Sequence, residues 1–308
     1  MMSVDVKEIR AAGTDTMQAF GPFYREAMTK AIEATGLGPK WFPLHLAAGI
    51  APEPFSTQRY HALYPYHKFA ARVATLDELA ETEYLQKIGA DTYRITEQGK
   101  ALVQGIFRAA HTSLGENEFL PDGEMAEIAA LLKKLVAAVE ASEQPPTKWA
   151  LEHSRAVDPG AGSAYAAQID QYLTDLYSVR DDAHIAAWKG YGLAPHVWEA
   201  LTFLWNGEGN SAAMLAEKLA FRDHSEQDYA AALEELAAQG LAEKAAEGYR
   251  ITEQGHVMRE NAEQETDRIY FSAWDALSAA EQTQLYTLLT RLKAKLVELA
   301  AEKEALVA

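Results

Sequence analysis

Polar residues in the second half of the chain have the types and the spacing of a binding site. Arg180 and His184 lie four residues apart, and Arg259, Glu263 and Asp267 follow one another at the same interval. Residues four apart share one face of a helix, so each set would present its side chains together. An arginine binds anions, a histidine titrates near neutral pH, and such groups orient ligands in pockets. One interpretation is therefore a small-molecule site.

Two other interpretations of these residues are open. Opposite charges at this spacing also form ion pairs, so the residues would instead make a salt-bridge network between two helices. With Asp182, the carboxylates and His184 have the ligand types of a hard-metal or acid–base site, although their spacing matches no recognised metal motif. There is no Gly-rich phosphate loop, G-x-S-x-G elbow or H-E-x-x-H. The sequence thus predicts no catalytic residue, metal ligand or cofactor, and it favours a binding protein over an enzyme.

Aromatic and histidine residues form a second set, in the first half of the chain. Tyr60, His61 and Tyr64 stand close together and would line a ligand cavity if they faced the same way. Tyrosines at helical spacing are also common core residues. Both interpretations are open at this point.

Cations that could contact phosphate groups are also found in the first half. They are Arg59, His67, Lys68, Arg72, Lys87 and Arg94. Acidic residues at 77, 78, 81 and 83 follow closely, so a solvated helix of mixed charge is the alternative. The corresponding stretch of the second half, 225–239, contains four acidic residues and no Lys or Arg, so it would repel DNA.

An internal repeat indicates which elements position these residues. The heptapeptide Y-R-I-T-E-Q-G occurs at 93–99 and again at 249–255, an offset of 156 residues. The match runs without a gap from 36–99 to 192–255, and after one added residue it aligns 120–135 with 277–292. The sequence therefore predicts two copies of one domain.

Each copy has apolar periodicities that predict helix, helix, short helix, longer helix, a two-strand hairpin and two long helices. Three helices before a hairpin are the order of a winged helix-turn-helix. A stretch rich in Pro and Gly at 143–163 separates the copies. The predicted fold is mainly α with small β-hairpins: an N-terminal helix and a first winged-helix domain at 1–142, a linker at 143–163, and a linker helix and a second winged-helix domain at 164–308.

The repeated residues carry a resemblance to the MarR superfamily. The pattern consists of Leu233 and Leu236 before Gly240-Leu241, the heptapeptide on the return strand of the hairpin, and the leucines spaced through 277–292. In that superfamily the terminal helices build a homodimer. The resemblance therefore implies an intrachain pseudo-dimer, either as a monomer with an internal pseudo-two-fold axis or within a homodimer. It also implies transcriptional regulation, duplex DNA as a partner, and a small molecule bound between the wings and the terminal helices.

The second half is also similar to the SalK-type helix-turn-helix proteins of actinobacteria. Their R-x-D-x-H pattern appears at 180, 182 and 184. A second pattern, R-x-x-x-E-x-x-T-D-R followed by W, appears at Arg259, Glu263, Thr266, Asp267, Arg268 and Trp274. This resemblance implies a regulator but no defined activity.

The composition limits these possibilities. Forty-five acidic residues against 28 Lys and Arg give a formal net charge of −17, which disfavours DNA binding unless a local basic face exists. There are no cysteines, so disulfides and thiolate sites are excluded. No apolar run approaches the roughly 18 residues of a membrane span, and the first ten residues lack the pattern of a secretory signal. We expect a cytoplasmic protein without membrane contact.

Two hypotheses of function follow. The first is a ligand-responsive, MarR-like transcriptional regulator that binds DNA mainly through the first copy. The alternative is a winged-helix scaffold without DNA binding, which serves as a small-molecule-binding protein or as an enzyme that uses the pocket around His184.

Overall fold

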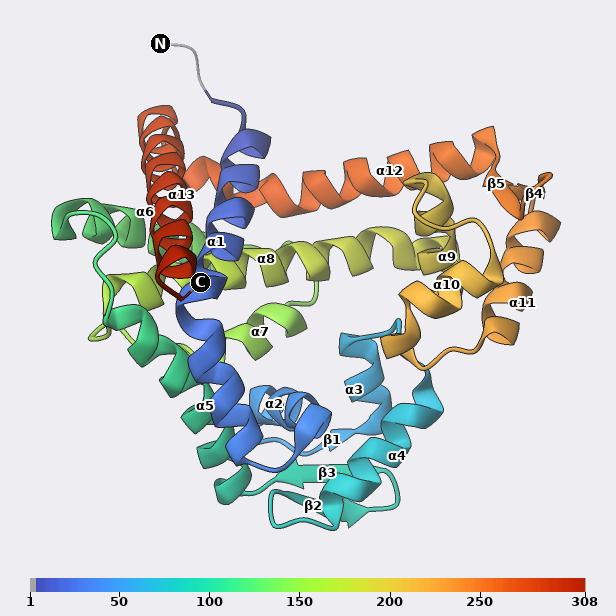
Figure 1. Cartoon of the computed structure of the whole chain (residues 1–308). Coiled ribbons are helices and arrows are strands. Elements are labelled where there is room, and N and C mark those ends of the chain that lie inside the picture. Colours follow the sequence, from blue (N-terminus) through green and yellow to red (C-terminus); the bar gives the residue numbers. More distant parts are fainter. Residues whose placement is uncertain (1–3, 308) are drawn as a thin grey trace. The chain divides into compact units, whose positions relative to one another are not determined.

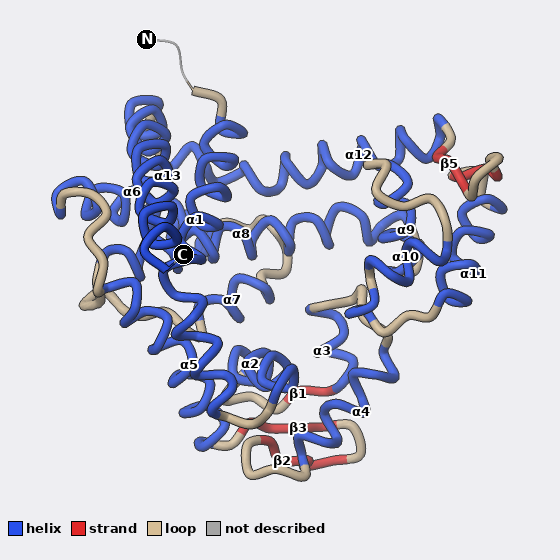
Figure 2. The backbone as a smooth tube through the Cα atoms, viewed as in Figure 1, coloured by secondary structure: helices blue, strands red, loops and turns tan. Residues whose placement is uncertain are grey.

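The computed structural model of the protein describes residues 4–307, and helices dominate it (Figures 1 and 2). The first half contains α1 (Val6–Ala34), the 3-10 helix η1 (Gly38–Lys40), α2 (Trp41–Ile50), β1 (Phe55–Ser56), α3 (Thr57–Leu63), α4 (Phe69–Ala80), β2 (Leu85–Gly89), β3 (Thr92–Ile95), α5 (Glu97–Gly115) and α6 (Asp122–Ala141). The second half contains α7 (Trp149–Arg155), α8 (Tyr165–Trp188), η2 (Lys189–Tyr191), α9 (Pro195–Trp205), α10 (Ala212–Lys218), η3 (Ala220–Arg222), α11 (Glu226–Ala238), β4 (Ala242–Lys244), β5 (Tyr249–Ile251), α12 (Glu253–Tyr270), η4 (Phe271–Ala276) and α13 (Ala279–Val307). The predicted order of helices followed by a hairpin is present in both halves.

The chain forms two compact units, and each of them draws on both halves of the sequence. Unit 1 comprises residues 1–53, 95–183 and 269–308, and unit 2 comprises 54–94 and 184–268. The units therefore differ from the sequence division at 1–142, 143–163 and 164–308. Helix α5 accounts for part of the difference, because it belongs to unit 1 while the wing before it lies almost wholly in unit 2. Helix α12, which follows the second wing, stays in unit 2 up to residue 268.

Unit 1 is built from long helices. Helix α1 packs along α13 and α5, while α6 packs against α13 and η4, and Figure 1 shows α1 beside α13. Its core holds apolar side chains such as Phe20, Leu135 and Leu292, all of which are buried.

The stretch predicted as a linker contributes to this unit. Within 143–163 the chain forms α7, whose Ala150 and Leu151 are buried. Asp182 of α8 accepts hydrogen bonds from the backbone N–H groups of these two residues, at 2.9 and 3.1 Å. A buried carboxylate thus satisfies two of the free N–H groups that begin every helix, and this holds α7 on α8.

Unit 2 contains the two helix-and-wing modules. In the first, β1 pairs with β3 and β3 with β2, and Phe55 stands opposite Tyr93. In the second, β4 pairs antiparallel with β5, with Ala242 opposite Ile251. Trp198, Tyr229 and Leu233 are buried in a core that α9, α10 and α11 share with the second wing.

The repeated heptapeptide has the same local role in both copies. Its tyrosine, arginine and isoleucine lie on the return strand of a wing, and its threonine precedes the next helix. The hydroxyl of Thr96 accepts from the N–H of Gly99, and that of Thr252 accepts from the N–H of Gly255, both at 3.1 Å. The repeat therefore encodes a strand followed directly by a capped helix.

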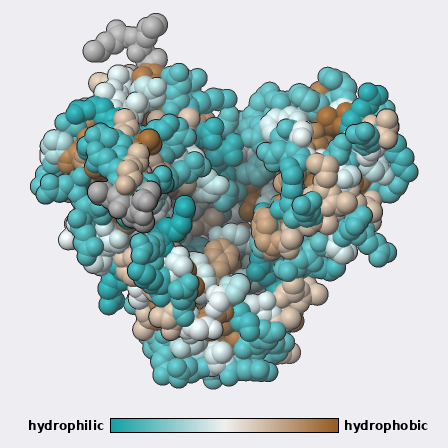
Figure 3. Space-filling model, viewed as in Figure 1, coloured by the Kyte–Doolittle hydropathy of each residue, from teal (hydrophilic) through white to brown (hydrophobic). Residues whose placement is uncertain are grey.

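The described surface is largely polar on the face seen in Figure 3, where hydrophobic residues lie in small groups. No helix within residues 4–307 is long and apolar enough to cross a lipid bilayer.

A buried carboxyl group on α8 leads to a prediction of pH dependence. Burial raises the pKa of Asp170 from its ordinary value of 3.8 to about 7. The folded protein thus holds this proton over a pH range in which the unfolded chain has lost it. The protonated carboxyl group of Asp170 therefore makes its whole contribution to the free energy of unfolding below about pH 4, and this contribution disappears as the pH rises through 7. We expect the difference in unfolding free energy between wild type and Asp170→Asn to shift in favour of the variant from pH 4.5 to pH 8.

Urea unfolding of both proteins, followed by circular dichroism, measures this difference. Because the variant is compared with wild type at each pH, titration of histidines and other groups cancels. A difference that stays constant across the range would show that Asp170 is ionised in the folded protein.

Candidate functional site

The helix-turn-helix of the first copy consists of α3, α4 and the wing β2–β3. Ser56 caps α3, because its hydroxyl accepts from the N–H of Arg59. Phe55, Tyr60 and Tyr93 are buried beneath the helices. Helix α4, which comes directly before the wing, occupies the position of the recognition helix in a winged helix-turn-helix.

Arg72, predicted to contact DNA, is a core residue of α4 and does not reach the surface. It is 8% exposed, its Nη1 lies 3.4 Å from the hydroxyl of Tyr60, and its guanidinium carbon lies 5.4 Å from the centre of the Tyr60 ring. Arg72 is the only Lys or Arg within Phe69–Ala80. Helix α4 therefore offers no cation to a phosphate group.

The other predicted DNA-binding residues lie around this helix. Lys68 pairs with Asp228 at 2.7 Å, and Lys87 on β2 pairs with Asp77 at 2.5 Å. Burial lowers the pKa of His67 to about 3, so its ring is neutral at physiological pH. Arg94 is exposed on β3 and Arg59 is half-buried on α3. The cations that solvent reaches are thus on the wing and beside α3 rather than on the recognition helix.

The recognition element of the second copy, α11, is acidic. Ser225 and Asp228 form a capping box at its beginning. Glu226, Glu234 and Glu235 are exposed, and Glu226–Ala238 contains no Lys or Arg. On the wing behind it, Lys244 pairs with Glu234 and Arg250 with Glu243. The exposed side of α11 therefore carries negative charge, which is unfavourable for contact with phosphate groups.

The second predicted constellation centres on Arg259 of α12. Its side chain is 2% exposed and lies between two indole rings, 4.9 Å from Trp198 and 4.8 Å from Trp205. Its Nη2 donates to Glu263 at 2.9 Å. Such a guanidinium gains both cation–π attraction and a charge-assisted hydrogen bond.

His184 joins the same network. Its Nδ1 lies 3.2 Å from the hydroxyl of Thr266 and 3.7 Å from Glu263. Thr266 donates its own proton to the carbonyl of Ala262, while the indole N–H of Trp198 donates to Nε2 of His184. This pattern fits the imidazole tautomer that carries its proton on Nδ1. The geometry favours the salt-bridge network among the three interpretations of these residues.

Two members of this constellation, Arg180 and Asp182, belong to unit 1, whereas the Arg259 network belongs to unit 2. Asp182 caps α7 and makes no part of the Arg259 network. Arg180 lines a cavity inside unit 1, whereas His184 belongs to unit 2. Asp267 is half-buried on α12, one turn after Glu263. Among the described residues, no group of three His, Asp or Glu is arranged to hold a metal ion.

The aromatic and histidine set of the first copy is also divided. Tyr60 is fully buried, and burial raises its pKa to about 12. His61 lines a cavity of about 310 Å³ in unit 2 together with Phe69 and Trp188. Tyr64 is half-buried at the end of α3. Of the three residues, His61 alone is among those that line this cavity.

Sequence reasoning missed Arg10 and Tyr270, which line the cavity of unit 1 together with Arg180. Neither belongs to a motif in the chain, and Arg10 precedes the repeated region. Trp274, which lines the same cavity, stands in the pattern shared with SalK-type proteins, and that pattern was the one available signal.

Comparison with known proteins identifies the family. A sequence profile of a helix-turn-helix family matches residues 105–302, nearly two thirds of the chain. The matched segment includes the whole second helix-and-wing module, α9 to β5, and the helices on either side of it. No curated protein and no solved structure gave a significant match. The chain belongs to this helix-turn-helix family.

Proposed function

We propose that this protein is a DNA-binding transcriptional regulator of MarR-like type that responds to a small molecule. The observation that carries the proposal is the order of helices and wing, which occurs in both halves of a chain that belongs to a helix-turn-helix family. The packing of α1 and α6 against α13 within unit 1 supports the accompanying idea of an intrachain pseudo-dimer. A cavity in that unit, described below, supports a role for a ligand.

DNA contact is proposed for the first copy, through its wing and the residues beside α3. Arg94 is exposed on the wing, and Lys87 is 39% exposed in its pair with Asp77. Solvent screens an ion pair at this exposure and makes it weak, so a phosphate group can replace Asp77 as the partner of Lys87. Each cation that reaches a phosphate releases counterions, which makes the affinity fall with salt.

A salt titration tests this proposal. Fluorescence anisotropy with a labelled 30-base-pair duplex of random sequence should show binding at about 50 mM salt that weakens steeply as salt rises. The double variant Lys87→Ala/Arg94→Ala should bind about tenfold more weakly at 50 mM salt and lower the slope of log K against log salt by about 2.

The matched control is Lys244→Ala/Arg250→Ala, which removes the same charge from the wing of the second copy. We expect it to bind DNA as the wild type does, because these cations are paired with Glu234 and Glu243 beside an acidic helix. Equal losses in both double variants would mean that net charge, rather than the first wing, governs binding.

The charge of the recognition helices favours a second candidate function, that of a small-molecule-binding protein which keeps the winged-helix scaffold without binding DNA. Arg72 of α4 is buried and α11 has only acidic charges on its exposed side. The commonest specific contact to a base edge comes from an arginine or lysine, and the exposed sides of these helices carry neither. No detectable binding to the duplex at 50 mM salt would exclude the regulator and leave this second candidate.

A further inference from the structure

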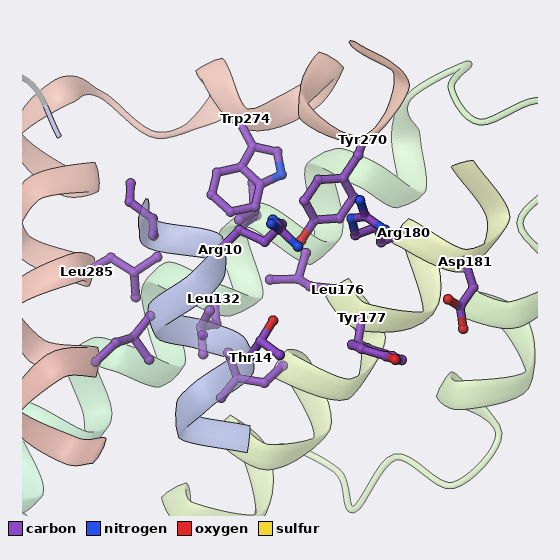
Figure 4. A pocket seen from close by; sticks show the side chains of 15 residues that line it. Arg10, Thr14, Leu132, Leu176, Tyr177, Arg180, Asp181, Tyr270, Trp274 and Leu285 are labelled. Carbon is purple, nitrogen blue, oxygen red and sulfur yellow. The ribbon is translucent and has the colours of Figure 1, made fainter. Parts of the chain in front are cut away.

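The cavity of unit 1 has the composition of a binding site for an apolar anion. Its volume is about 250 Å³, and six elements supply its walls: α1, α6, α8, the end of α12, η4 and α13. Leucines of α6, α8 and α13 form much of the lining. In Figure 4, the polar ends of Arg10, Arg180 and Tyr270 gather on one side, and Leu132 and Leu285 lie on the other.

The polar groups of this cavity are mostly donors. Arg10 and Arg180 contribute two guanidinium groups, and Asp181 is the one carboxylate among the residues that line it. Nε of Arg10 is buried and has no hydrogen-bond partner among the described residues. A buried N–H group is costly unless an acceptor reaches it, so an acceptor beside Nε of this half-buried arginine would be favourable.

Trp274 supplies an independent observation. Its side chain is 3% exposed, it lines the same cavity, and its indole Nε1 has no acceptor among the described residues. An indole N–H can only donate, and buried donors are almost always satisfied. Figure 4 shows the indole above Arg10 and beside Tyr270. An oxygen-bearing ligand in the cavity would satisfy both Trp274 and Arg10.

We infer that this cavity binds a carboxylate with an apolar body. The guanidinium groups of Arg10 and Arg180 hold the carboxylate, Trp274 donates to one of its oxygens, and the leucines surround the apolar part. Size supports this class, because a cavity of roughly 150 Å³ takes up one benzene ring, so 250 Å³ accommodates a body of about eight carbons. Bidentate arginine contacts select a carboxylate over a neutral polar group.

The inference deepens the proposed ligand response but does not require DNA binding, because it is tested on the protein alone. Isothermal titration calorimetry with sodium octanoate, on the full chain, should give saturable binding with a dissociation constant on the order of 0.1 mM. 1-Octanol has the same chain without the charge and should bind at least tenfold more weakly. Inorganic phosphate, which has charge without an apolar body, should not compete at 5 mM.

Three variants assign the contacts. Arg10→Gln and Arg180→Gln should each weaken octanoate at least tenfold, and Trp274→Phe should weaken it severalfold. Arg25→Gln is the matched control, because Arg25 lies on α1 with Arg10 but is exposed and outside the cavity. It should bind as the wild type does. Arg10→Lys, which keeps the charge but cannot make the bidentate contact, should recover part of the affinity lost in Arg10→Gln, and this partial recovery separates loss of the contact from loss of the fold.

The inference is overturned if octanoate shows no saturable binding up to 5 mM, if 1-octanol binds equally well, or if Arg10→Gln and Arg25→Gln bind octanoate alike. If octanoate binds as expected and the duplex DNA assay fails, the anion site stands without the regulator. If DNA binds and octanoate does not, the proposed regulator stands without this site.

Discussion

Replacing Arg259 with alanine is expected to lower the free energy of unfolding by about 3 kcal/mol, since removing one member of a buried ion pair typically has an effect of this size. Arg259 is 2% exposed and fills the space between the rings of Trp198 and Trp205. Truncation would leave a cavity there and deprive Glu263 of the cation at 2.9 Å. Urea unfolding at pH 7, followed by far-UV circular dichroism, measures the change.

The control for this prediction is Arg268→Ala on the same helix. Arg268 also pairs with a carboxylate three residues away, Glu265 at 2.6 Å, but its side chain is 62% exposed. Solvent screens exposed pairs of this kind, so we expect no measurable change in the free energy of unfolding. Equal effects of the two alanine variants would contradict a structural role for the buried position.

A third variant separates the volume of Arg259 from its charge. Nε and Nη1 of Arg259 have no hydrogen-bond partner within the described part of the chain, so part of the cost of burying this cation is not offset. Arg259→Met fills a similar space without a charge, and such replacements are often neutral relative to the ion pair. We expect methionine to recover at least half of the stability that alanine loses.

The Arg259 network illustrates what spacing along the chain can predict. Arg259 and Glu263 do pair across one helical turn, as the interval of four residues suggested. Residue type groups Asp182 with them as a possible metal or acid–base ligand, yet Asp182 holds the beginning of α7 instead. Spacing gives the face of a helix on which a residue lies. It does not give the segment that packs on that face, and α7 lies in a stretch whose sequence indicated only a linker.

Arg72 likewise shows that residue type and position along the chain do not predict which residues reach a DNA-binding surface. The type of the residue and its place before the wing suggested a phosphate contact, and the hydroxyl and ring of Tyr60 bury it instead. By contrast, the order of helices and hairpins was predictable because it depends on local periodicity and on the repeat. Ser225, for example, caps α11 where the sequence placed the start of a helix. The cavity of unit 1 was not predictable, because Arg10, Arg180 and Trp274 meet only after α1, α8 and η4 have packed.

Replacing Gly255, the last residue of the repeated heptapeptide, with alanine should lower the free energy of unfolding of the protein by about 3 kcal/mol. This is the upper end of the usual cost of overpacking. A Cβ atom at this position would lie 2.8 Å from Cγ1 of Ile251 and in hard overlap with the carbonyl oxygen of Leu241. That oxygen accepts a hydrogen bond from the N–H of Thr252, so it cannot move without disturbing the junction between wing and helix.

Local helix propensity predicts the opposite sign for this substitution, which makes the measurement decisive. Gly255 lies in the first turn of α12 with no positive φ, and alanine is about 1 kcal/mol better than glycine within a helix. Gly105→Ala provides the matched control, because Gly105 is exposed within α5 and no atom lies within 4 Å of the Cβ position. There we expect a gain of about 0.5–1 kcal/mol. If Gly255→Ala stabilised the protein as well, α12 could not lie as close to Leu241, the residue before β4, as it does in this structure. The glycine of the heptapeptide would then be there for reasons other than packing.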